Sequence, residues 1–528
     1  MNKKNNQNGR ILILDFGSQY TQLIARCIRD IGVYCELLSC DAQKIEIKKF
    51  NPSGIILSGS YQSVTNFDSP KITEYILQSN LPVLGICYGM QVMCFQLGGT
   101  VEKINKKREY GYSKIFIKKK SELLGNIYDD INQNKEKFLD VWMSHEDTVT
   151  SIPKDFFVVG STKNCEYAII EHKSKKMYGL QFHPEVTQTI QGKSILKRFV
   201  LKICNCRQYW KTSLMINDSI SKIKRKINKD YAILGLSGGI DSLTSALLVH
   251  RAIGNQLICI FVNNGLLRFN ETKEIIDKYS KLFHLNVIYI DSEKRFLDSL
   301  IGIQDPEKKR KIIGHLFIEI FNEIAKKYKK VKWLIQGTIY PDLIESTSFS
   351  NDKKSKVIKL HHNVGGLPKV MKLKLIEPLK FFFKDEVKKI GKNLGIPYDI
   401  LHRHPFPGPG LAVRIIGEVK KEYCDLLRLV DEIFIEELKK KKLYYRIDQA
   451  FSIFIPVRSV GIMGDRRKYD WVIALRAINT TDFMTAKWTP LSHKFLSHVS
   501  NRIINEISGI SRVVYDITDK PPSTIEWE

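Results

Sequence analysis

The sequence predicts an α/β protein with two doubly wound, mostly parallel-sheet domains, followed by an α+β domain. Short apolar runs alternate with amphipathic helical stretches through most of the chain. Because parallel strands need crossover helices that cover both faces of the sheet, this alternation favours parallel sheets. After about Arg403 the pattern changes at a dense proline–glycine stretch, His404–Gly410, which interrupts regular structure.

The expected strands are short apolar or β-branched runs that end near Gly, Ser, Asn or Asp. They are Ile11–Leu14, Gly54–Leu57, Val83–Ile86, Lys176–Phe182, Tyr231–Leu236, Leu257–Val262, Val287–Ile290 and Lys332–Ile335.

These strands fall into two blocks, which set the expected domain boundaries. The first block ends near Cys206, so the first domain spans residues 10–207. The second domain spans residues 208–403 and opens with a basic, helical connector at Gln208–Asp230. The third spans residues 404–528 and contains a long charged helix at about Val419–Lys441.

Composition excludes several classes of protein. The chain has 528 residues and no apolar run of the ~18 residues that a membrane span needs, so we expect no membrane partner. Met1–Arg10 is polar and lacks the apolar stretch of a signal peptide, which favours a cytoplasmic protein. The ten cysteines include no C-x-x-C pair, so neither a zinc site nor a disulfide framework is expected.

The net charge of +27 raises the alternative of a nucleic-acid binder. Lysine is spread along the whole chain, however, and no basic patch interleaved with aromatic residues stands out. We therefore expect no nucleic-acid partner, although such a surface attracts anionic substrates.

The first candidate site lies where an apolar strand meets a helix. Gly85-Ile86-Cys87-Tyr88-Gly89 has the form G-x-C-x-G, in which small residues allow a sharp turn that projects the central side chain. The N-terminus of the following helix favours the thiolate form of Cys87. The pattern therefore predicts a nucleophilic cysteine.

A base for this cysteine is predicted at the end of a later strand. His183 follows the run Met177–Phe182, and Glu185 lies two residues further on, where a carboxylate can orient the imidazole. Cys87, His183 and Glu185 then form a catalytic triad of the Cys–His–acid type.

This first region resembles the class I glutamine amidotransferases in Asp15–Tyr20, Leu57–Gly59, Gly85–Gln91, Trp142–His145 and His183–Glu185. The resemblance implies that Cys87 attacks the side-chain amide of glutamine, with the backbones of Gly59 and Tyr88 as oxyanion hole. The chain departs from the family at Ser60, Tyr61 and Glu146. A serine where the backbone requires positive φ would be strained, which would weaken glutamine hydrolysis.

The second candidate site is a glycine-rich loop between a strand and a helix. Ser237-Gly238-Gly239-Ile240-Asp241-Ser242 is followed by the helical run Leu243–Arg251. Free N–H groups and the helix dipole make such a turn a cradle for phosphate, and the serine hydroxyls add donors. No Gly-Lys-Ser/Thr closes the loop, so it is not a Walker A motif.

The S-G-G-x-D-S pattern resembles the pyrophosphate loop of ATP pyrophosphatases, which split ATP into AMP and pyrophosphate. The resemblance implies that Ser237–Leu243 bind ATP and that Asp241 helps to hold Mg²⁺, since this cation prefers oxygen ligands. The chain departs from the family at Leu243, at Leu360, and at Asn263, where a carboxylate is usual. These departures put the rate of adenylation in question.

Further stretches resemble the GMP synthetase family over nearly the whole chain, from Ile11 to Glu528. They are Asp305–Gly314, Gln336–Ser346, His361–Pro368, His404–Leu411 and Lys520–Glu528. The resemblance implies glutamine, ATP and xanthosine 5'-monophosphate (XMP) as substrates, with GMP as product. Arg310 and Lys520 would bind the XMP phosphate, Glu526 would bind the nucleotide, and the third domain would pair two subunits in a homodimer.

Two enzymatic alternatives remain. One is the same synthetase with weakened glutamine hydrolysis, running on free ammonia, as the departures at Ser60, Tyr61, Glu146 and Asn263 suggest. The other is a different two-site amidating enzyme, such as a glutamine-dependent NAD synthetase. That enzyme lacks the motifs of the third domain and uses another type of glutaminase.

Overall fold

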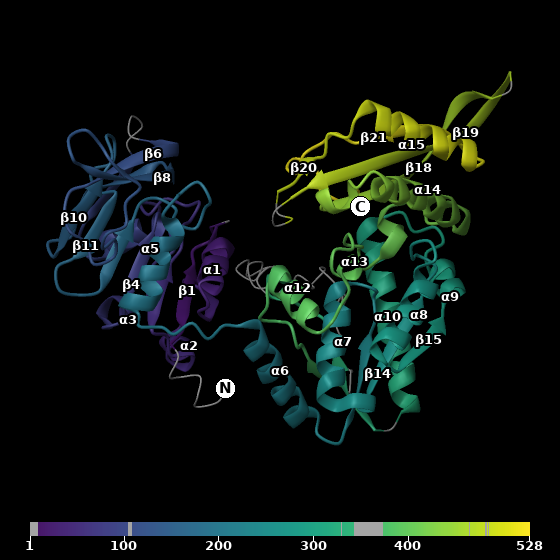
Figure 1. The fold of residues 1–528 in the computed structure, drawn as a ribbon, viewed down its shortest axis with the longest axis horizontal. Coiled ribbons are helices and arrows are strands. Elements are labelled where there is room, and N and C mark those ends of the chain that lie inside the picture. Colours follow the sequence, from purple (N-terminus) through teal and green to yellow (C-terminus); the bar gives the residue numbers. More distant parts are fainter. Residues whose placement is uncertain are drawn as a thin grey trace. The chain divides into compact units, whose positions relative to one another are not determined.

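The structure is a computed structural model that describes residues 9–18, 20–103, 108–328, 330–342, 373–463, 465–480, 483 and 485–528. The chain divides into two compact units, Met1–Met215 and Ile216–Glu528. Figure 1 shows the first unit in purple and blue and the second in teal, green and yellow.

A ten-stranded sheet forms the first unit. Its strands are, in spatial order, β2 (Cys35–Ser39), β1 (Ile11–Asp15), β3 (Gly54–Leu57), β4 (Val83–Ile86), β12 (Met177–Leu180), β11 (Ile169–His172), β10 (Phe156–Ser161), β6 (Glu109–Ile117), β8 (Lys137–His145) and β7 (Asp130–Ile131). A two-stranded sheet, β5 (Thr100–Lys103) with β9 (Asp147–Ser151), completes the β-structure described in this unit.

Only half of this large sheet follows the expected parallel arrangement. The ladders from β2 to β12 are parallel, and β1, β3, β4 and β12 are buried along almost their whole length, as strands covered on both faces are. From β12 to β7 the ladders are antiparallel. The prediction of a mostly parallel sheet is therefore wrong for β11, β10, β6, β8 and β7, which have no crossover helices between them.

Helices α1 (Thr21–Asp30), α2 (Lys44–Phe50), α3 (Glu74–Gln78) and α4 (Tyr88–Gln96) lie between the parallel strands in the sequence of the first unit. Helix α5 (Gly192–Arg198) follows the last strand, β12, and continues as a π-helical turn at Phe199–Ile203. Helices α1 and α5 contact each other on one face of the sheet (Figure 1). Helix α6 (Thr212–Ile227) occupies the predicted connector.

The second unit contains a five-stranded, wholly parallel sheet. Its order is β15 (Val287–Asp291), β14 (Leu257–Asn263), β13 (Tyr231–Gly235), β16 (Val331–Ile335) and β17 (Lys374–Ile376). Helices whose full bounds are described in this part are α7 (Ile240–Ile253), α8 (Glu271–Phe283), α9 (Glu293–Ser299), α10 (Pro306–Lys327), α12 (Lys384–Asn393) and α13 (Tyr398–Leu401). The four strands predicted here are present, with ends shifted by one residue at most.

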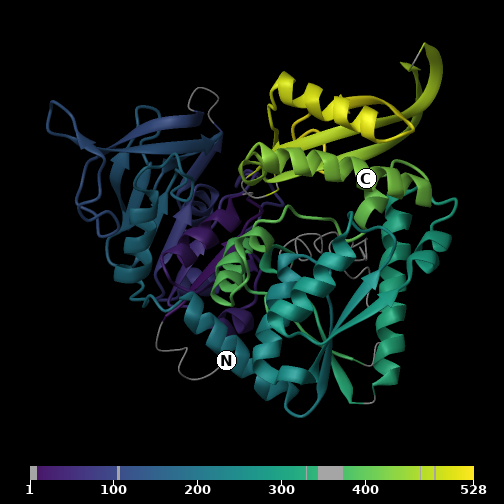
Figure 2. The ribbon, with the colours of Figure 1, turned by 45° about the vertical axis from the view of Figure 1, so that its right-hand side comes forward.

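The last part of the chain forms a mixed sheet backed by two helices. Its elements are α14 (Lys421–Lys440), β18 (Gln449–Met463), β19 (Arg466–Asn479), β20 (Lys487–Trp488), α15 (His493–Glu506) and β21 (Ile510–Tyr515). Strand β19 is central, antiparallel to β18 and β20 and parallel to β21. Helices α14 and α15 pack together against this sheet (Figure 2).

Described residues of 216–403 and 404–528 share one hydrophobic core within the second unit. The core joins Ile233 and Ile260 of the parallel sheet to Phe434 of α14 and Phe454 of β18. The proline–glycine stretch docks at the end of β14, where the Leu411 N–H donates to the Leu266 carbonyl at 2.8 Å. Among the described residues, no helix combines the length and the apolar character that crossing a membrane would require.

Candidate active sites

The turn after β4 carries Cys87 in a sharp strand-to-helix bend. Cys87 has φ 52° and ψ −109°, outside the regions that residues with a β-carbon ordinarily occupy. Close contacts require both neighbouring glycines: a β-carbon at Gly85 would lie 2.6 Å from the Met90 nitrogen, and one at Gly89 would lie 2.4 Å from the Leu57 oxygen. The G-x-C-x-G pattern therefore folds as the expected bend and holds Cys87 in a strained backbone conformation.

His183 reaches Cys87 because their strands are neighbours. Strands β4 and β12 pair with Ile86 opposite Leu180, and the Cys87 N–H donates to the Leu180 carbonyl at 2.7 Å. His183 lies close enough to Cys87 for the sulfur to raise the pKa of the imidazole. Its Nδ1 lies 2.7 Å from Oε1 of Glu185, and both side chains are buried. The structure thus brings the three predicted residues together.

The electrostatics of this cluster favour a protonated His183. Burial lowers the pKa of His183, but the negative charges of Glu185 and Cys87 outweigh it and hold that pKa well above its ordinary value. Gln181, which sequence analysis did not select, donates from Nε2 to the Cys87 sulfur at 3.8 Å. It lies just beyond β12 and precedes His183 by two residues, a spacing that puts two side chains on the same side of an extended chain and is the signal that could have identified it.

The residues expected to form the oxyanion hole border this cluster. A β-carbon at Gly59 would lie 3.4 Å from Cε1 of His183. Tyr88 is the first residue of α4, and the first N–H groups of a helix have no acceptor within it. The strain considered at Ser60 is absent, because Ser60 does not adopt a positive φ and its Oγ accepts the Gln62 N–H at 3.1 Å.

The other departures beside this site are surface residues. Tyr61 is 83% exposed. Glu146 pairs with Lys103 at 2.6 Å and accepts the Tyr110 hydroxyl at 3.2 Å, contacts that lower the pKa of Glu146. Within the described part of the chain, neither Tyr61 nor Glu146 hydrogen-bonds or forms an ion pair with Cys87, His183 or Glu185.

We expect Glu185→Gln to lower glutamine hydrolysis about 10²- to 10⁴-fold, as for other triads that lose the charge of their acid. Glutamine keeps the shape but removes the main charge that raises the pKa of His183. Ionised His183 persists in the wild type as the pH rises past neutrality, whereas in the variant it is lost at lower pH. A pH profile of glutaminase kcat/KM measures this shift, and an unchanged alkaline limb would contradict the role of Glu185.

The loop Ser237–Ser242 joins β13 to α7 and is held by its own side chains. Ser242 Oγ donates to the Gly239 carbonyl at 3.0 Å and lies 3.1 Å from Ser237 Oγ. Gly238 has φ 76°, and a β-carbon there would lie 2.6 Å from Cδ1 of Ile275. Ser237 and Gly239 are exposed, so the outer edge of the loop remains open to an anion.

Two further residues of the predicted ATP site support the loop from behind. Ile240 begins α7, and Leu243 is fully buried with its N–H donating to the Gly239 carbonyl at 3.2 Å. Gly337 packs against the helix start, since a β-carbon there would lie 3.2 Å from the Ser242 nitrogen. Leu243 therefore shapes the turn and presents no side chain to a ligand.

Asp241 lies in the first turn of α7 and faces a cation from a distant helix. Its Oδ2 pairs with Nζ of Lys384 at 2.5 Å, while its buried Oδ1 has no hydrogen-bond partner. Lys384 is the first residue of α12, and no sequence motif connects it to the loop. Lys384 is thus a candidate ATP-site residue that sequence analysis missed and that only packing identifies.

Asn263, which stands where the family usually has a carboxylate, lies beside an aspartate of the next strand. Asn263 ends β14 opposite Asp291 of β15, and its Nδ2 donates to Oδ1 of Asp291 at 3.1 Å. A carboxylate therefore still lies at this edge of the sheet, one strand away. The departure at Leu360 and the motif His361–Pro368 lie outside the described residues.

Glu526, predicted to bind the nucleotide, is held by two buried residues. Arg414 forms a two-point contact with it, with Nε 3.1 Å from Oε2 and Nη2 2.9 Å from Oε1. Gln449 donates to the same Oε1 at 2.8 Å. Arg414 is 1% exposed, and its guanidinium lies 4.2 Å from the centre of the Phe451 ring. Arg414 lies three residues beyond the motif His404–Leu411 and is far from Glu526 in the sequence, so the sequence alone does not reveal that the two residues pair.

Arg310 lies at the start of α10 near the same segment. Its Nη2 donates to the Glu528 carbonyl at 2.5 Å, and the charge of Glu526 also acts on it. The neighbouring Lys309 is fully buried and pairs with the Glu528 carboxylate. Burial lowers the pKa of Lys309, and Glu528 opposes that shift. Arg310 and Glu526 are thus brought together.

Lys520 contacts another part of the chain. Its Nζ donates to the Phe483 carbonyl at 2.7 Å, and its backbone pairs with Ala486. In the part of the chain that the structure describes, no hydrogen bond or ion pair joins Lys520 to Arg310 or Glu526.

A second buried cluster in the first unit consists of Glu109, His145 and Cys165, whose potential ligand atoms lie within 4.8 Å of one another. His145 Nδ1 lies 3.0 Å from the Asp147 carbonyl, and its Nε2 lies 3.3 Å from Glu109. Thr162 donates to Glu109 at 2.8 Å. We interpret this cluster as a hydrogen-bonded network that connects β6 to β8.

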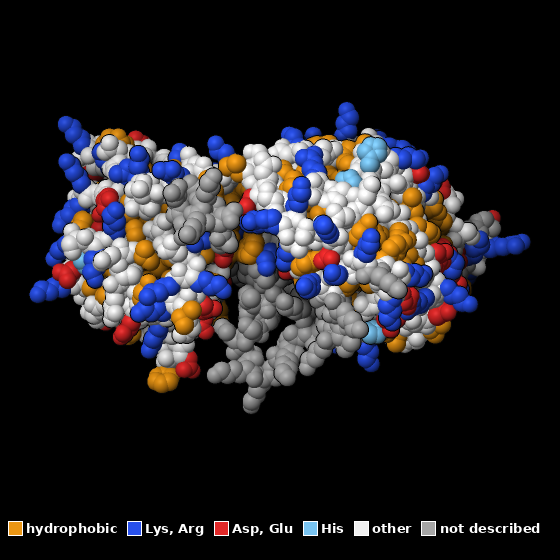
Figure 3. Space-filling view, turned by 90° about the horizontal axis from the view of Figure 1, so that it is seen from below, with side chains coloured by type: hydrophobic (Ala, Val, Ile, Leu, Met, Phe, Trp, Pro, Cys, Tyr) orange, Lys and Arg blue, Asp and Glu red, His pale blue; other side chains and the backbone are white. Residues whose placement is uncertain are grey.

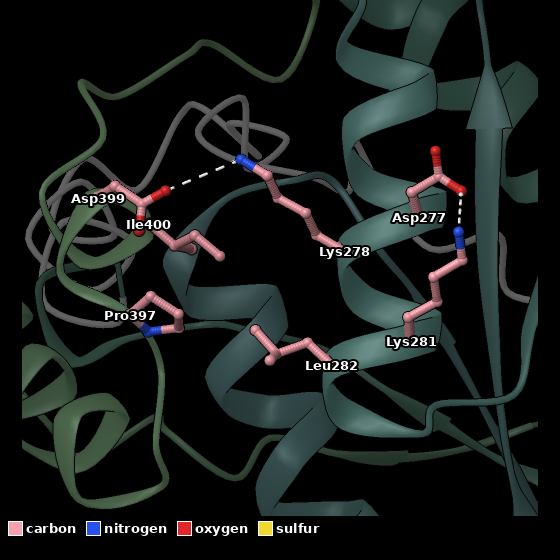
Figure 4. A pocket seen from close by; sticks show the side chains of 7 residues that line it. All are labelled: Asp277, Lys278, Lys281, Leu282, Pro397, Asp399 and Ile400. Atoms are coloured by element: carbon pink, nitrogen blue, oxygen red, sulfur yellow. Dashed lines mark ion pairs between the residues drawn. The ribbon is translucent and has the colours of Figure 1, made fainter.

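A pocket of about 360 Å³ lies between α8 and the segment Pro397–Ile400 (Figure 4). Its charged side chains are paired, Lys281 with Asp277 at 3.3 Å and Lys278 with Asp399 at 3.8 Å.

On the face shown in Figure 3, Lys and Arg side chains are dispersed among apolar and acidic ones. This face does not show the concentrated basic patch of a nucleic-acid interface.

Comparison with known proteins identifies the class of this chain. The family model "Glutamine amidotransferase class-I" matches residues 12–203, and "GMP synthase C terminal domain" matches residues 436–527. The chain is therefore an enzyme of the class that couples a class I glutamine amidotransferase to a synthase domain.

Curated relatives give the family. "GMP synthase [glutamine-hydrolyzing]" from Proteus mirabilis is 60% identical over 524 residues, which cover 99% of each chain. The protein of the same name from Yersinia enterocolitica is 59% identical over 99% of this chain and 100% of its own. The chain belongs to the family of glutamine-hydrolysing GMP synthases.

Proposed function

We propose that this chain makes GMP from XMP in two half-reactions: it releases ammonia from glutamine at Cys87 and activates XMP with ATP at the Ser237–Ser242 loop. Glutamate, AMP and pyrophosphate are the other products. The observation that carries the proposal is the buried cluster of Cys87, His183 and Glu185 at the adjoining ends of β4 and β12 in a chain of this family.

In the first half-reaction the Cys87 thiolate attacks the side-chain carbonyl carbon of glutamine. The oxyanion receives hydrogen bonds from the N–H groups of Gly59 and Tyr88, where fixed donors are worth about 3 kcal/mol each in comparable sites. Protonated His183 gives its proton to the leaving nitrogen, and ammonia departs. His183 then takes a proton from water, which attacks the thioester and releases glutamate.

In the second half-reaction the loop Ser237–Ser242 binds the phosphates of ATP. The O2 oxygen of XMP attacks the α-phosphorus, pyrophosphate leaves, and ammonia then displaces AMP to give GMP. Lys384 beside the loop adds positive charge for the departing pyrophosphate.

Asp241 fits the expected Mg²⁺, because its buried Oδ1 has no hydrogen-bond partner and carboxylate oxygen is a preferred ligand of this cation. When bound, Mg²⁺ supplies charge neutralisation at the phosphates. Lys384 keeps the other oxygen of Asp241 fixed and so orients the free one.

XMP is recognised by the last residues of the chain together with α10. Arg310 suits a phosphate because its guanidinium forms paired hydrogen bonds, and Lys520 adds a second cation. Glu526 accepts hydrogen bonds from the purine. The orientation of Glu526 is set by Arg414 and Gln449.

A homodimer is supported by apolar side chains that the hairpin of β18 and β19 exposes. Val457, Val460, Ile462 and Tyr469 are 57%, 49%, 77% and 59% exposed. Apolar surface of this kind is typical of protein interfaces. We therefore propose that this hairpin contributes to the contact between two subunits.

The test is a product analysis with XMP, ATP and Mg²⁺. With glutamine labelled by ¹⁵N in the side-chain amide, we expect the label in GMP. GMP, AMP and pyrophosphate should form in equal amounts. GMP from ammonium salts but not from glutamine would favour the alternative of an enzyme that runs on free ammonia. No GMP from either nitrogen source would refute the proposal.

A further inference from the structure

The segment Asp516–Glu528 carries two of the proposed XMP-binding residues but has no helix or ladder of its own. Apart from an isolated bridge at Lys520, its backbone consists of irregular stretches, turns and bends. Backbone carbonyls in such a segment must find donors elsewhere. Its conformation is therefore decided by the side chains that contact it.

Three fully buried cations supply those contacts. Arg414 and Arg476 are the two largest fully buried side chains, and Lys309 is among the same group. Lys309 and Arg414 hold the acidic side chains at the end of the segment, Glu528 and Glu526. Arg476 holds the segment's backbone.

Arg476 lies in β19 opposite Phe451 and is 0% exposed. Each of its five guanidinium N–H groups has an acceptor in the segment, so none is left unsatisfied. The acceptors are the Asp516 carboxylate, the carbonyls of Thr518 (3.0 Å), Thr524 (3.0 Å) and Ile525 (2.9 Å), and Ser523 Oγ (3.1 Å).

These acceptors lie on both sides of Lys520 and end at the residue before Glu526. One planar group therefore fixes the distance and orientation between the two parts of the segment. Asp516 joins the arrangement further, because its Oδ2 also accepts the Trp527 indole N–H at 2.9 Å.

We propose that Arg476 is a positioning residue for the nucleotide site, which holds Asp516–Ile525 so that Lys520 and Glu526 face XMP. This inference rests on the proposal that Lys520 and Glu526 bind XMP. A lysine cannot replace Arg476, because an ammonium group has three donors for the five acceptors and lacks the planar fork.

The test is Arg476→Lys in the full chain, with Arg502→Lys as the matched control. Arg502 pairs α15 with Glu436 and Glu437 of α14 in the same part of the fold and does not contact the segment. We expect Arg476→Lys to raise the KM for XMP about 10- to 100-fold, as buried acceptors lose their donors. The KM for ATP and the rate of glutamine hydrolysis should stay within about twofold of wild type, and Arg502→Lys should leave all three unchanged.

Hydrogen exchange of residues 516–528 gives a second readout that does not depend on activity. We expect faster exchange there in Arg476→Lys than in wild type or the control. If Arg476→Lys does not fold, Asp516→Asn carries the test, because it removes one charged acceptor and leaves no cavity.

Faster exchange with an unchanged KM for XMP would overturn the inference, as would a raised KM without faster exchange. An equal rise of the KM for XMP and ATP would also overturn it, since that marks a general loss of structure. If the wild type neither binds XMP nor makes GMP, the proposed function itself fails and this inference fails with it.

Discussion

Replacing Cys87 with alanine is expected to abolish GMP synthesis from glutamine and to leave synthesis from ammonium salts intact. The sulfur is the only group of the cluster that can form the thioester, so glutamine-driven synthesis should fall at least about 10³-fold. Ammonia added from solution bypasses this step. Parallel assays of GMP formation with glutamine and with ammonium chloride measure the two activities.

The control is Cys40→Ala, which replaces a partly buried cysteine of the first unit that lies outside the β4–α4 turn. It should keep both activities. If Cys87→Ala makes GMP from glutamine as fast as the wild type, Cys87 is not the nucleophile. If both activities fall together, the variant has disturbed more than the glutaminase step, and thermal unfolding will show whether the first unit is destabilised.

Replacing Asp241 with asparagine is expected to lower GMP synthesis from both nitrogen sources about 100-fold, a loss of ~2.7 kcal/mol in the transition state. The neutral amide loses the charge that pairs with Lys384 and the oxygen proposed to bind Mg²⁺. Glutamine hydrolysis measured without ATP and XMP should be unaffected. GMP formation from ammonium chloride across a range of Mg²⁺ concentrations measures the effect.

Asp385→Asn is the control for this variant. Asp385 follows Lys384 at the start of α12, is exposed, and pairs with Lys389 on its own helix. Asp385, like Asp241, is an aspartate close to Lys384, but its ion pair is with Lys389 and not with the loop. The activity of Asp385→Asn should therefore match that of the wild type. Wild-type synthesis in Asp241→Asn, at any Mg²⁺ concentration, would contradict the role of Asp241 at the phosphates.

Local sequence patterns predicted the parts of the fold that depend on a few consecutive residues. The strand ends before Cys87 and Ser237 and the helices after them follow from apolar runs that meet glycine-rich turns. The antiparallel strands from β6 to β11 were missed, because no helices separate them in the sequence and the expectation was built on strands that alternate with helices.

The candidate site residues also divide into those that local sequence predicts and those that it does not. Cys87, His183 and the S-G-G-x-D-S loop can be predicted from short sequence motifs, because a turn and its neighbouring side chains form one local unit. Gln181 could have been predicted in the same way. Lys384, Arg414 and Arg476 were not, because each acts on a group that lies far away along the chain.

The sequence by itself determined which chemical groups this protein has and at which strand ends they stand. Tertiary structure alone decided their partners: Lys384 for Asp241, Arg414 for Glu526, and Arg476 for the segment that carries Lys520. The physical reason is that a turn is specified by the conformational limits of its own residues. A buried charge is specified by the acceptors that packing brings to it, and those acceptors come from any part of the chain.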